Sequence, residues 1–256
     1  MIKKHYHIYK RKFLQFLSSK NNVNISNDGL TFKVNGGYLH IERASEYIAF
    51  FNLPANGIIF DVGGGIGATS KLFSKALPKS EIHVFEPIKN NLAKIQAFCS
   101  SCKNITYHNI ALGNDNLEQE INVTNNVTSS SLLDIEENID SQFFADSLNK
   151  KDSEKIQVRR LDDLSLAKNI NILKIDTQGF ELEVLKGAVN NLQNINIVVL
   201  ELANHQFYKG APQYHEIDQF FRENNFELYD MIPGIMRERK LYEWDSIYVN
   251  KKILNK

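Results

Sequence analysis

The stretch Ile58-Ile-Phe-Asp-Val-Gly-Gly-Gly-Ile-Gly67 decides the fold of this chain, because an apolar run opens directly into four glycines. The pattern predicts a strand, a tight turn and then a helix. Gly63, Gly65 and Gly67 leave the turn without side chains, so a ligand can lie against the backbone and meet the N–H groups of the following helix. We expect a nucleotide-like ligand at this turn.

Two acidic residues refine this expectation. Asp61 lies at the end of the predicted strand, and Glu86 closes the next apolar run, Ile82-His-Val-Phe-Glu-Pro87. A carboxylate in the second position can accept hydrogen bonds from both hydroxyls of a ribose. Because Glu86 follows Gly63-x-Gly65-x-x-Ala68 by about 20 residues, the stretch also fits a relaxed dinucleotide fingerprint, which is typical of NAD-dependent oxidoreductases. A purely structural turn that closes a strand against a helix is the third interpretation.

The rest of the chain alternates between predicted strands and helices. Strands are expected at 58–62, 81–86, 104–108, 157–162, 170–176, 195–202 and 226–229, and helices at 67–76, 89–101, 181–192 and 214–224. Strands separated by helices pair in parallel through right-handed crossovers. The last strand, 246–249, is expected to pair antiparallel at the sheet edge. The chain has little room for the second nucleotide-binding half or separate substrate domain of a dehydrogenase.

We expect two parts in the chain. Residues 1–54 are predicted to form an N-terminal cap or lid, with a basic helical segment around Tyr6–Leu17, a hairpin over 30–41 and a helix over 42–51. Residues 55–256 form the main domain. A polar stretch over 123–155 interrupts the alternation and is expected to lie as an insertion over the strand ends, where loops carry specificity.

Composition excludes several classes of protein. Thirty basic residues balance thirty acidic ones, so no global field attracts the chain to nucleic acid or to an anionic membrane. No run approaches the ~18 apolar residues of a membrane span, and the N-terminus lacks a secretory apolar region, so we expect a cytoplasmic protein. Both a monomer and a homo-oligomer stay open. Cys99 and Cys102 form a C-x-x-C without further cysteines, which favours structural thiols over a zinc or redox site.

The chain resembles the FkbM-type methyltransferases, which depend on S-adenosylmethionine (SAM). The motifs that carry the resemblance are Phe60-Asp-Val-Gly-Gly-Gly-Ile-Gly67, Val84-Phe-Glu-Pro87, Asn109-Ile-Ala-Leu-Gly113, Ser129-Ser-Ser-Leu132, Leu173-Lys-Ile-Asp-Thr-Gln-Gly-Phe-Glu-Leu-Glu-Val-Leu-Lys-Gly-Ala188 and Val198-Val-Leu-Glu-Leu202. One departure is Gln178, which stands where the family often has an acidic residue.

The resemblance implies an α/β, Rossmann-like methyltransferase fold: a mostly parallel seven-stranded sheet with an antiparallel edge strand, together with the N-terminal cap. It implies SAM-dependent O-methylation of a hydroxyl of a sugar, glycan or other hydroxylated metabolite. SAM is then expected over the glycine turn, with Glu86 at the ribose and Leu112 near the adenine; the expected cofactor-binding residues are Asp61, Gly63, Gly65, Gly67, Glu86, Leu112 and Asp176. A non-catalytic nucleotide-binding module remains an alternative.

The catalytic residues are expected at the ends of two later strands. The sulfonium methyl is electrophilic, so the protein must align an acceptor oxygen and remove one proton. An alcohol is a poor nucleophile, so a general base or a divalent metal is required. Asp176 is the first candidate for the base or a metal ligand, with Glu201 and His205 as second candidates.

Overall fold

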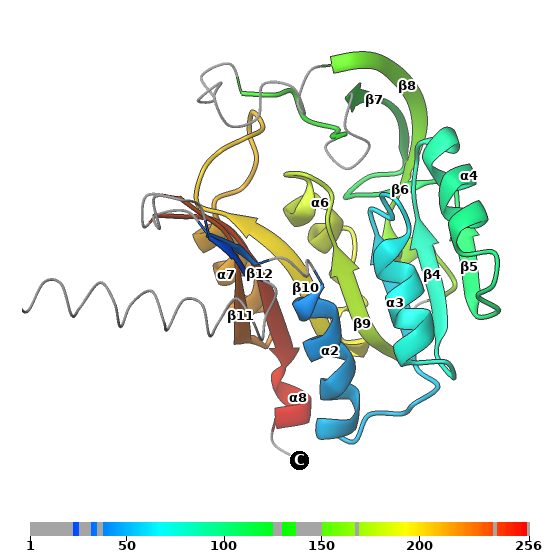
Figure 1. Cartoon of the computed structure of the whole chain (residues 1–256), viewed down its shortest axis with the longest axis vertical. Helices are drawn as coiled ribbons and strands as arrows, with labels where there is room; N and C mark the ends of the chain where they lie inside the picture. Colours follow the sequence, from blue (N-terminus) through cyan, green and yellow to red (C-terminus); the bar gives the residue numbers. More distant parts are fainter. Residues whose placement is uncertain are drawn as a thin grey trace, which may run out of the picture.

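A computed structural model of the chain describes residues 23–25, 32–34, 38–124, 130–136, 150–166, 169–237 and 240–254. Within these residues, one large sheet has the strand order β1-β2-β11-β12-β10-β9-β3-β4-β5 (Figure 1). The predicted basic helical segment around Tyr6–Leu17 lies outside the described residues. No helix in the described ranges is long and apolar enough to cross a bilayer.

The parallel half of the sheet is built around the strand that precedes the glycine turn. This strand, β3 (Ile58–Val62), lies between β4 (Glu81–Phe85) and β9 (Ile170–Ile175). The outer parallel strands are β5 (Ile105–His108), beside β4, and β10 (Ile195–Ala203), beside β9. The strand order therefore reverses between β3 and β9, which is where ligands bind in open sheets of this kind.

Antiparallel strands complete the sheet beyond β10. The strand β12 (Lys240–Asn250) runs antiparallel both to β10 and to β11 (Phe226–Arg237), which lies outside it. This confirms the mostly parallel seven-stranded sheet with antiparallel pairing toward that edge, although the expected strand 246–249 lies within β12 and is covered on its outer side by β11. The short strands β1 (Val23–Ile25) and β2 (Phe32–Val34) extend the sheet further, because β2 pairs with β11.

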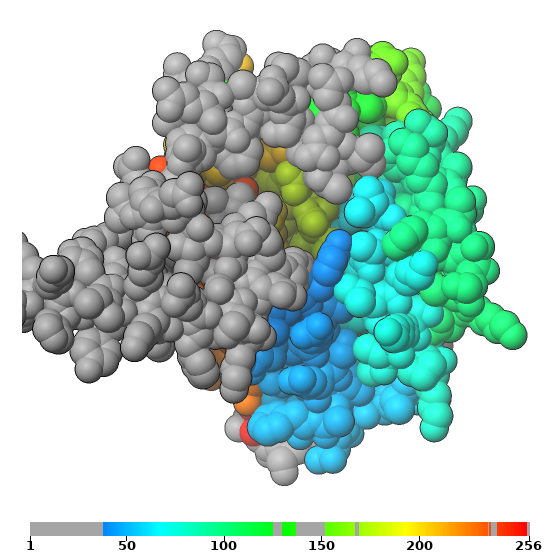
Figure 2. Space-filling view, in the orientation of Figure 1, coloured from blue at the N-terminus to red at the C-terminus, as the bar shows by residue number. Residues whose placement is uncertain are grey.

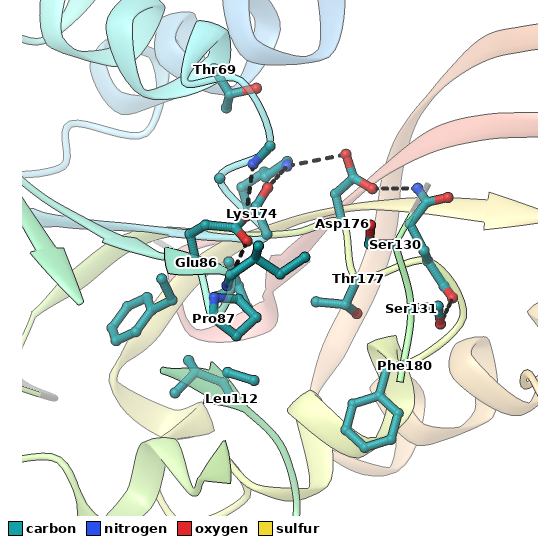
Figure 3. A pocket seen from close by; sticks show the side chains of 18 of the residues that line it. Thr69, Glu86, Pro87, Leu112, Ser130, Ser131, Lys174, Asp176, Thr177 and Phe180 are labelled. Carbon is teal, nitrogen blue, oxygen red and sulfur yellow. Dashed lines mark hydrogen bonds and ion pairs between the residues drawn. The ribbon is translucent and has the colours of Figure 1, made fainter. Parts of the chain in front are cut away.

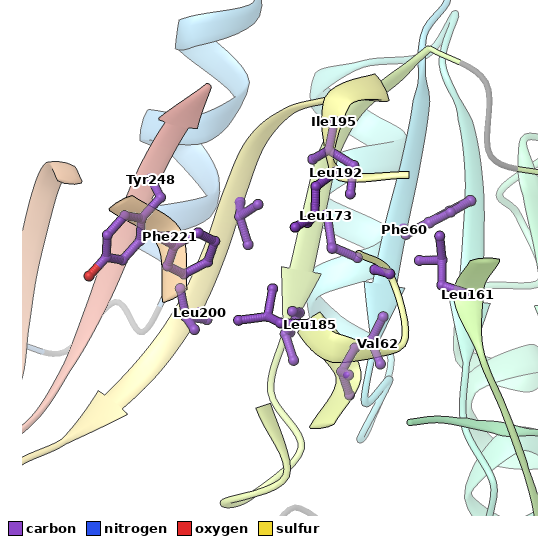
Figure 4. Packing of buried hydrophobic residues seen from close by; sticks show 14 of the residues in the cluster. Phe60, Val62, Leu161, Leu173, Leu185, Leu192, Ile195, Leu200, Phe221 and Tyr248 are labelled. Carbon is purple, nitrogen blue, oxygen red and sulfur yellow. The ribbon is translucent and has the colours of Figure 1, made fainter. Parts of the chain in front are cut away.

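Helices cover both faces of the sheet and enclose two apolar cores. One face carries α2 (Leu39–Phe50), α3 (Ala68–Ala76), α4 (Lys89–Phe98) and α8 (Lys251–Leu254). The other carries α6 (Glu181–Lys186) and α7 (Tyr214–Glu223). Successive strand residues point to opposite faces, and helices cover both faces of β9, so all six of its residues are buried, including the polar Asn171 and Lys174. Figure 4 shows the second core, in which Leu173, Leu185 and Phe221 are fully buried.

A second, smaller sheet was not predicted. It consists of β6 (Ala111–Leu112), β8 (Lys150–Arg159) and β7 (Leu117–Thr124), in that order. Of these strands, only residues 123–124 of β7 and 150–155 of β8 fall within the stretch predicted as an insertion, of which residues 125–129 and 137–149 lie outside the described ranges. The small sheet buries its own apolar side chains, including Ile121, Ile156 and Val158.

Two sequence-based predictions about local structure were wrong. The hairpin over 30–41 does not form, because Tyr38 begins a turn and Leu39–Phe50 is helical. Ile41, Ala44 and Ile48 recur at helical spacing and bury one face of α2 against the sheet. The helix predicted over 181–192 ends at Lys186. A Cβ on Gly187 would lie 1.9 Å from the carbonyl oxygen of Gly113, so the chain passes close to the small sheet there.

Candidate active site

A large pocket opens at the carboxyl ends of β3, β4 and β9. It has about 940 Å³ of space, counting its open mouth. Its walls come from the glycine turn, the segments after β4 and β9, the small sheet and Tyr38. We call it the glycine-turn pocket. Figure 2 shows a recess beside the blue and cyan atoms of the N-terminal third of the chain, with yellow-green atoms at its floor.

The turn needs glycine residues because of its backbone conformation and because another segment of the chain lies directly against it. Gly63, Gly65 and Gly67 all have positive φ angles, of 81°, 56° and 82°, which L side chains rarely adopt. A Cβ on Gly63 would lie 1.9 Å from the carbonyl oxygen of Asp176, so the turn packs directly on the segment after β9. Gly63 and Gly65 line the pocket, whereas Gly67 precedes α3 and packs against Ile95 of α4.

Glu86 faces the glycine turn from the end of β4. Its Oε2 accepts a hydrogen bond from the Gly65 N–H at 3.2 Å, and its Oε1 accepts one from the Ile88 N–H at 3.0 Å. The side chain is buried, and this burial raises the pKa of the carboxyl to about 7, although the backbone N–H groups oppose the shift. A carboxylate at this place presents hydrogen-bond acceptors to a ligand in the pocket (Figure 3).

Lys174 connects the floor of the pocket to the buried acid of β3. Its Nζ lies 3.4 Å from Asp61 Oδ1 and 3.3 Å from Asp176 Oδ2. Burial opposes the charge on Lys174, but the two carboxylates outweigh burial and raise the pKa of the ammonium. Asp61 is fully buried and also accepts a hydrogen bond from the Ser70 hydroxyl. Asp61, which was expected among the cofactor-binding residues, therefore does not line the pocket itself and is connected to it through Lys174.

Asp176 is the acid exposed in the pocket, with 39% of its side chain accessible. Burial by itself would raise the pKa of its carboxyl, but Lys174 and a hydrogen bond from the Gln178 amide (2.8 Å) hold that pKa below its usual range. Gln178 Oε1 in turn accepts a hydrogen bond from the Tyr208 hydroxyl at 2.9 Å. The carboxylate of Asp176 is thus ionised and held in a fixed orientation (Figure 3).

The other end of the pocket is apolar. Leu112 lies in β6, and it lines the pocket together with Ile88, Ala111 and Ile121. Phe180 closes the wall near the start of α6. An apolar slot at one end and charged groups at the other suit a ligand with an aromatic base and a polar tail.

Glu201 and His205 lie in a neighbouring, smaller pocket. It has about 460 Å³ of space, counting its mouth, and we call it the acidic pocket. Its lining residues are Gln178, Gly179, Glu181, Glu201, Leu202, Ala203, His205, Phe207, Tyr208, Ala211, Pro212, Ile217 and Glu243. Burial, followed by the charges of Asp176 and other carboxylates, raises the pKa of Glu201 well above its ordinary value.

The described residues offer no obvious metal centre. No group of three or more His, Cys, Asp or Glu side chains within them is arranged to hold an ion. Cys99 is a free thiol packed inside the core, and burial raises its pKa to about 11, so the reactive thiolate is disfavoured.

Comparison with known proteins identifies the family. The model of the methyltransferase FkbM domain matches residues 61–228, which is more than half of the chain. The chain belongs to the FkbM methyltransferase family. The matched range contains the glycine turn, Glu86, Lys174 and Asp176, and all residues that line the two pockets except Tyr38 and Glu243.

Individual relatives of this FkbM domain are distant. "Methyltransferase 1" of Beauveria bassiana is 25% identical over 171 residues, 59% of this chain and 66% of that protein. The "Hexuronic acid methyltransferase AglP" of Haloferax volcanii is 53% identical over 32 residues, 12% of this chain and 13% of that protein. The chain thus spans less than two thirds of either relative. Among solved structures, the chain is similar to the crystal structure of magnesium protoporphyrin IX methyltransferase from Synechocystis PCC 6803 with bound SAM. The match covers 82% of this chain and 79% of that chain, with 12% sequence identity and a TM-score of 0.48.

The structure divides the residues expected at the site into three places. Gly63, Gly65, Glu86, Leu112 and Asp176 line the glycine-turn pocket. Asp61 and Gly67 lie behind its wall, and Glu201 and His205 line the acidic pocket. Sequence reasoning did not anticipate Tyr38, which precedes α2, or Phe180 as pocket residues. Phe180 could have been found from its place in the 173–188 motif, but nothing in the sequence marks Tyr38.

Lys174→Met is predicted to destabilise the fold by about 3–5 kcal/mol, because it leaves the buried Asp61 carboxylate without its cation. The check is chemical denaturation. Adding Asp61→Asn should recover part of the loss. The control Lys186→Met removes the partner of Glu183 from an exposed pair and should cost below about 1 kcal/mol. Equal losses in Lys174→Met and Lys186→Met would contradict the structural role of the buried pair.

Proposed function

We propose that the chain is a SAM-dependent O-methyltransferase that binds SAM in the glycine-turn pocket and methylates a hydroxyl of a sugar, glycan or other hydroxylated metabolite. The observation that carries the proposal is Glu86, whose carboxylate lies at the glycine turn against the Gly65 N–H. In this arrangement the ribose hydroxyls donate to Glu86, the adenine lies by Leu112, and the methionine end points toward Asp176. Membership of the FkbM family supports methyl transfer.

An NAD-dependent oxidoreductase is the alternative that shares the glycine turn and the acid. The position of β12 favours the methyltransferase. A second nucleotide-binding half would continue the sheet with parallel strands, whereas β12 lies between β10 and β11 and is antiparallel to both. The two functions differ in a direct binding test: S-adenosylhomocysteine, and not NADH, should raise the melting temperature. The division into a cap over 1–54 and a domain over 55–256, and a cytoplasmic location, stay predictions from the sequence.

Cofactor affinity is predicted to depend on the protonation of Glu86. With its pKa at about 7 in the free protein, Glu86 is mostly neutral at pH 6 and mostly ionised at pH 8. A neutral carboxyl loses much of its capacity to accept from two ribose hydroxyls. If only the ionised form binds, affinity for S-adenosylhomocysteine falls roughly tenfold from pH 8 to pH 6. Isothermal titration calorimetry at the two pH values measures this.

Two variants test whether the pH dependence of binding comes from Glu86 or from another titrating group. Glu86→Gln should bind roughly tenfold or more weakly than wild type at pH 8, because a charge-assisted hydrogen bond is worth about 1.5–3 kcal/mol, and its affinity should not change with pH. The control Glu120→Gln alters an exposed residue of β7 and should keep the wild-type profile. Wild-type affinity in Glu86→Gln would refute the placement of the ribose.

For the chemical step we propose that Asp176 accepts the proton of the acceptor hydroxyl, with Glu201 as the second candidate. Asp176 is ionised and exposed in the pocket, but Lys174 makes it a weak base. Glu201, whose charged form is disfavoured, is the stronger proton acceptor once it is ionised. Two carboxyls with pKa values moved in opposite directions suit a proton transfer between substrate and protein.

Asp176→Asn is predicted to lower methyl transfer by about 10²–10⁴-fold while SAM binding persists. Transfer of a labelled methyl group to the acceptor, found by screening hydroxylated sugars, measures this rate. Asp115→Asn, an exposed change outside both pockets, is the control. A base predicts turnover that survives chelation, whereas a metal predicts loss on chelation and recovery with Mg²⁺ or Mn²⁺. Wild-type turnover in a folded, SAM-binding Asp176→Asn would place the chemistry elsewhere.

A further inference from the structure

The acidic pocket lies directly beside the glycine-turn pocket. Gln178 lines both, and its side chain spans the boundary: its amide nitrogen donates to Asp176 on one side, and its amide oxygen accepts from Tyr208 on the other. A group bound in the acidic pocket would therefore lie next to Asp176, where the proposed cofactor arrangement places the methionine end of SAM.

The acidic pocket has hydrogen-bonding capacity that the protein does not use. Glu181 is 6% exposed, and its Oε1 accepts from the Thr177 and Gly179 N–H groups. Oε1 also accepts from the Thr177 hydroxyl, and no other described residue donates a hydrogen bond to Oε2 of this pocket-lining side chain. The carboxyl of Glu201 likewise has no hydrogen-bond partner among the residues that the structure describes. Such groups need partners when a ligand displaces water, and hydroxyl groups supply them.

Aromatic side chains accompany these acids. Phe207 and Tyr208 are buried at 7% and 5% exposure and form one small apolar cluster at the pocket. Carboxyl oxygens can accept from hydroxyl groups while apolar ring surfaces cover C–H groups, and this combination fits a ring that carries several hydroxyls.

The charge of the acidic pocket restricts what can enter. Glu181, Glu201 and Glu243 line it, and no Lys or Arg does so among the described side chains. The charges of Asp176, Glu243, Asp245 and Glu181 already oppose ionisation of Glu201, after burial, and raise its pKa. The same field opposes any further anion placed beside Glu201, whereas it does not oppose a neutral or cationic group.

We propose that the acidic pocket binds the part of the acceptor next to the methylated hydroxyl, and that it takes polyhydroxylated groups without negative charge. This inference rests on the proposed function, because it needs SAM in the glycine-turn pocket to give the acidic pocket its role. It excludes uronic acids and sugar phosphates from this position, and it admits neutral sugars and amino sugars.

The test is a comparison of three matched probes: methyl glucoside, glucosamine and glucuronate. Their binding to the protein saturated with S-adenosylhomocysteine is measured by ligand-observed NMR titration. Methyl glucoside and glucosamine should bind, and glucuronate should bind at least ~tenfold more weakly than the glucoside. Equal or tighter binding of glucuronate, or no binding of any probe, overturns the inference. Failure of S-adenosylhomocysteine to bind is read separately and refutes the proposed function instead.

A charge-reversal variant tests the location. Glu201→Lys should raise the affinity for glucuronate relative to the glucoside at least ~tenfold, because it places a cation in the pocket. The control Glu227→Lys makes the same change on the exposed part of β11 and should keep the wild-type ranking. Melting temperature and S-adenosylhomocysteine binding report on folding. A folded Glu201→Lys with the wild-type ranking overturns the location; if that variant does not fold, the wild-type ranking decides.

Discussion

The ion pair between Lys174 and Asp61 is the interaction on which the site depends. The two residues are direct partners in the pairing of β9 with β3, at the point where the strand order reverses. Because Asp61 is fully buried, its charge is tolerable only with the ammonium and the Ser70 hydroxyl beside it. The same ammonium holds Asp176, so one buried cation connects the core of the sheet to the floor of the pocket.

This constraint fixes the glycine turn. The Asp176 N–H donates to the Val62 carbonyl at 3.0 Å, so the two strands leave the sheet side by side. Their approach puts the Asp176 carbonyl where a Cβ of residue 63 would stand, and only glycine fits there. The turn then presents the Gly65 N–H to Glu86, which closes the wall. One set of contacts thus positions both the proposed cofactor site and the proposed base.

The sequence predicted the parallel core well because strong local signals agree there. Apolar runs that end in glycines or acids, as at Ile58–Gly67 and Ile82–Pro87, predict both a strand and the residue that stands at its end. It failed where tertiary contacts decide. No strand was predicted over Leu117–Thr124, which becomes one by pairing with β8. The start of α2 was predicted as part of a hairpin, but Ile41 and Ile48 pack on the sheet at helical spacing.

The same distinction applies to the site. Motifs predicted which residues stand at strand ends, but not which of them face the pocket. Whether Asp61 faces the ligand or the core depends on Lys174, and the separation of Glu201 from Asp176 depends on Gln178 and Tyr208. Sequence spacing does not reveal the contact of Lys174 with Asp61 or that of Gln178 with Tyr208, because each joins segments that meet only in the folded chain.

The most direct measurement is a crystal structure of the protein with S-adenosylhomocysteine. The account predicts both ribose hydroxyls at hydrogen-bonding distance from the Glu86 carboxylate, the adenine against Leu112, and the sulfur at the end of the pocket near Asp176. A ligand bound elsewhere, or bound over the glycine turn with its ribose turned away from Glu86, would contradict it.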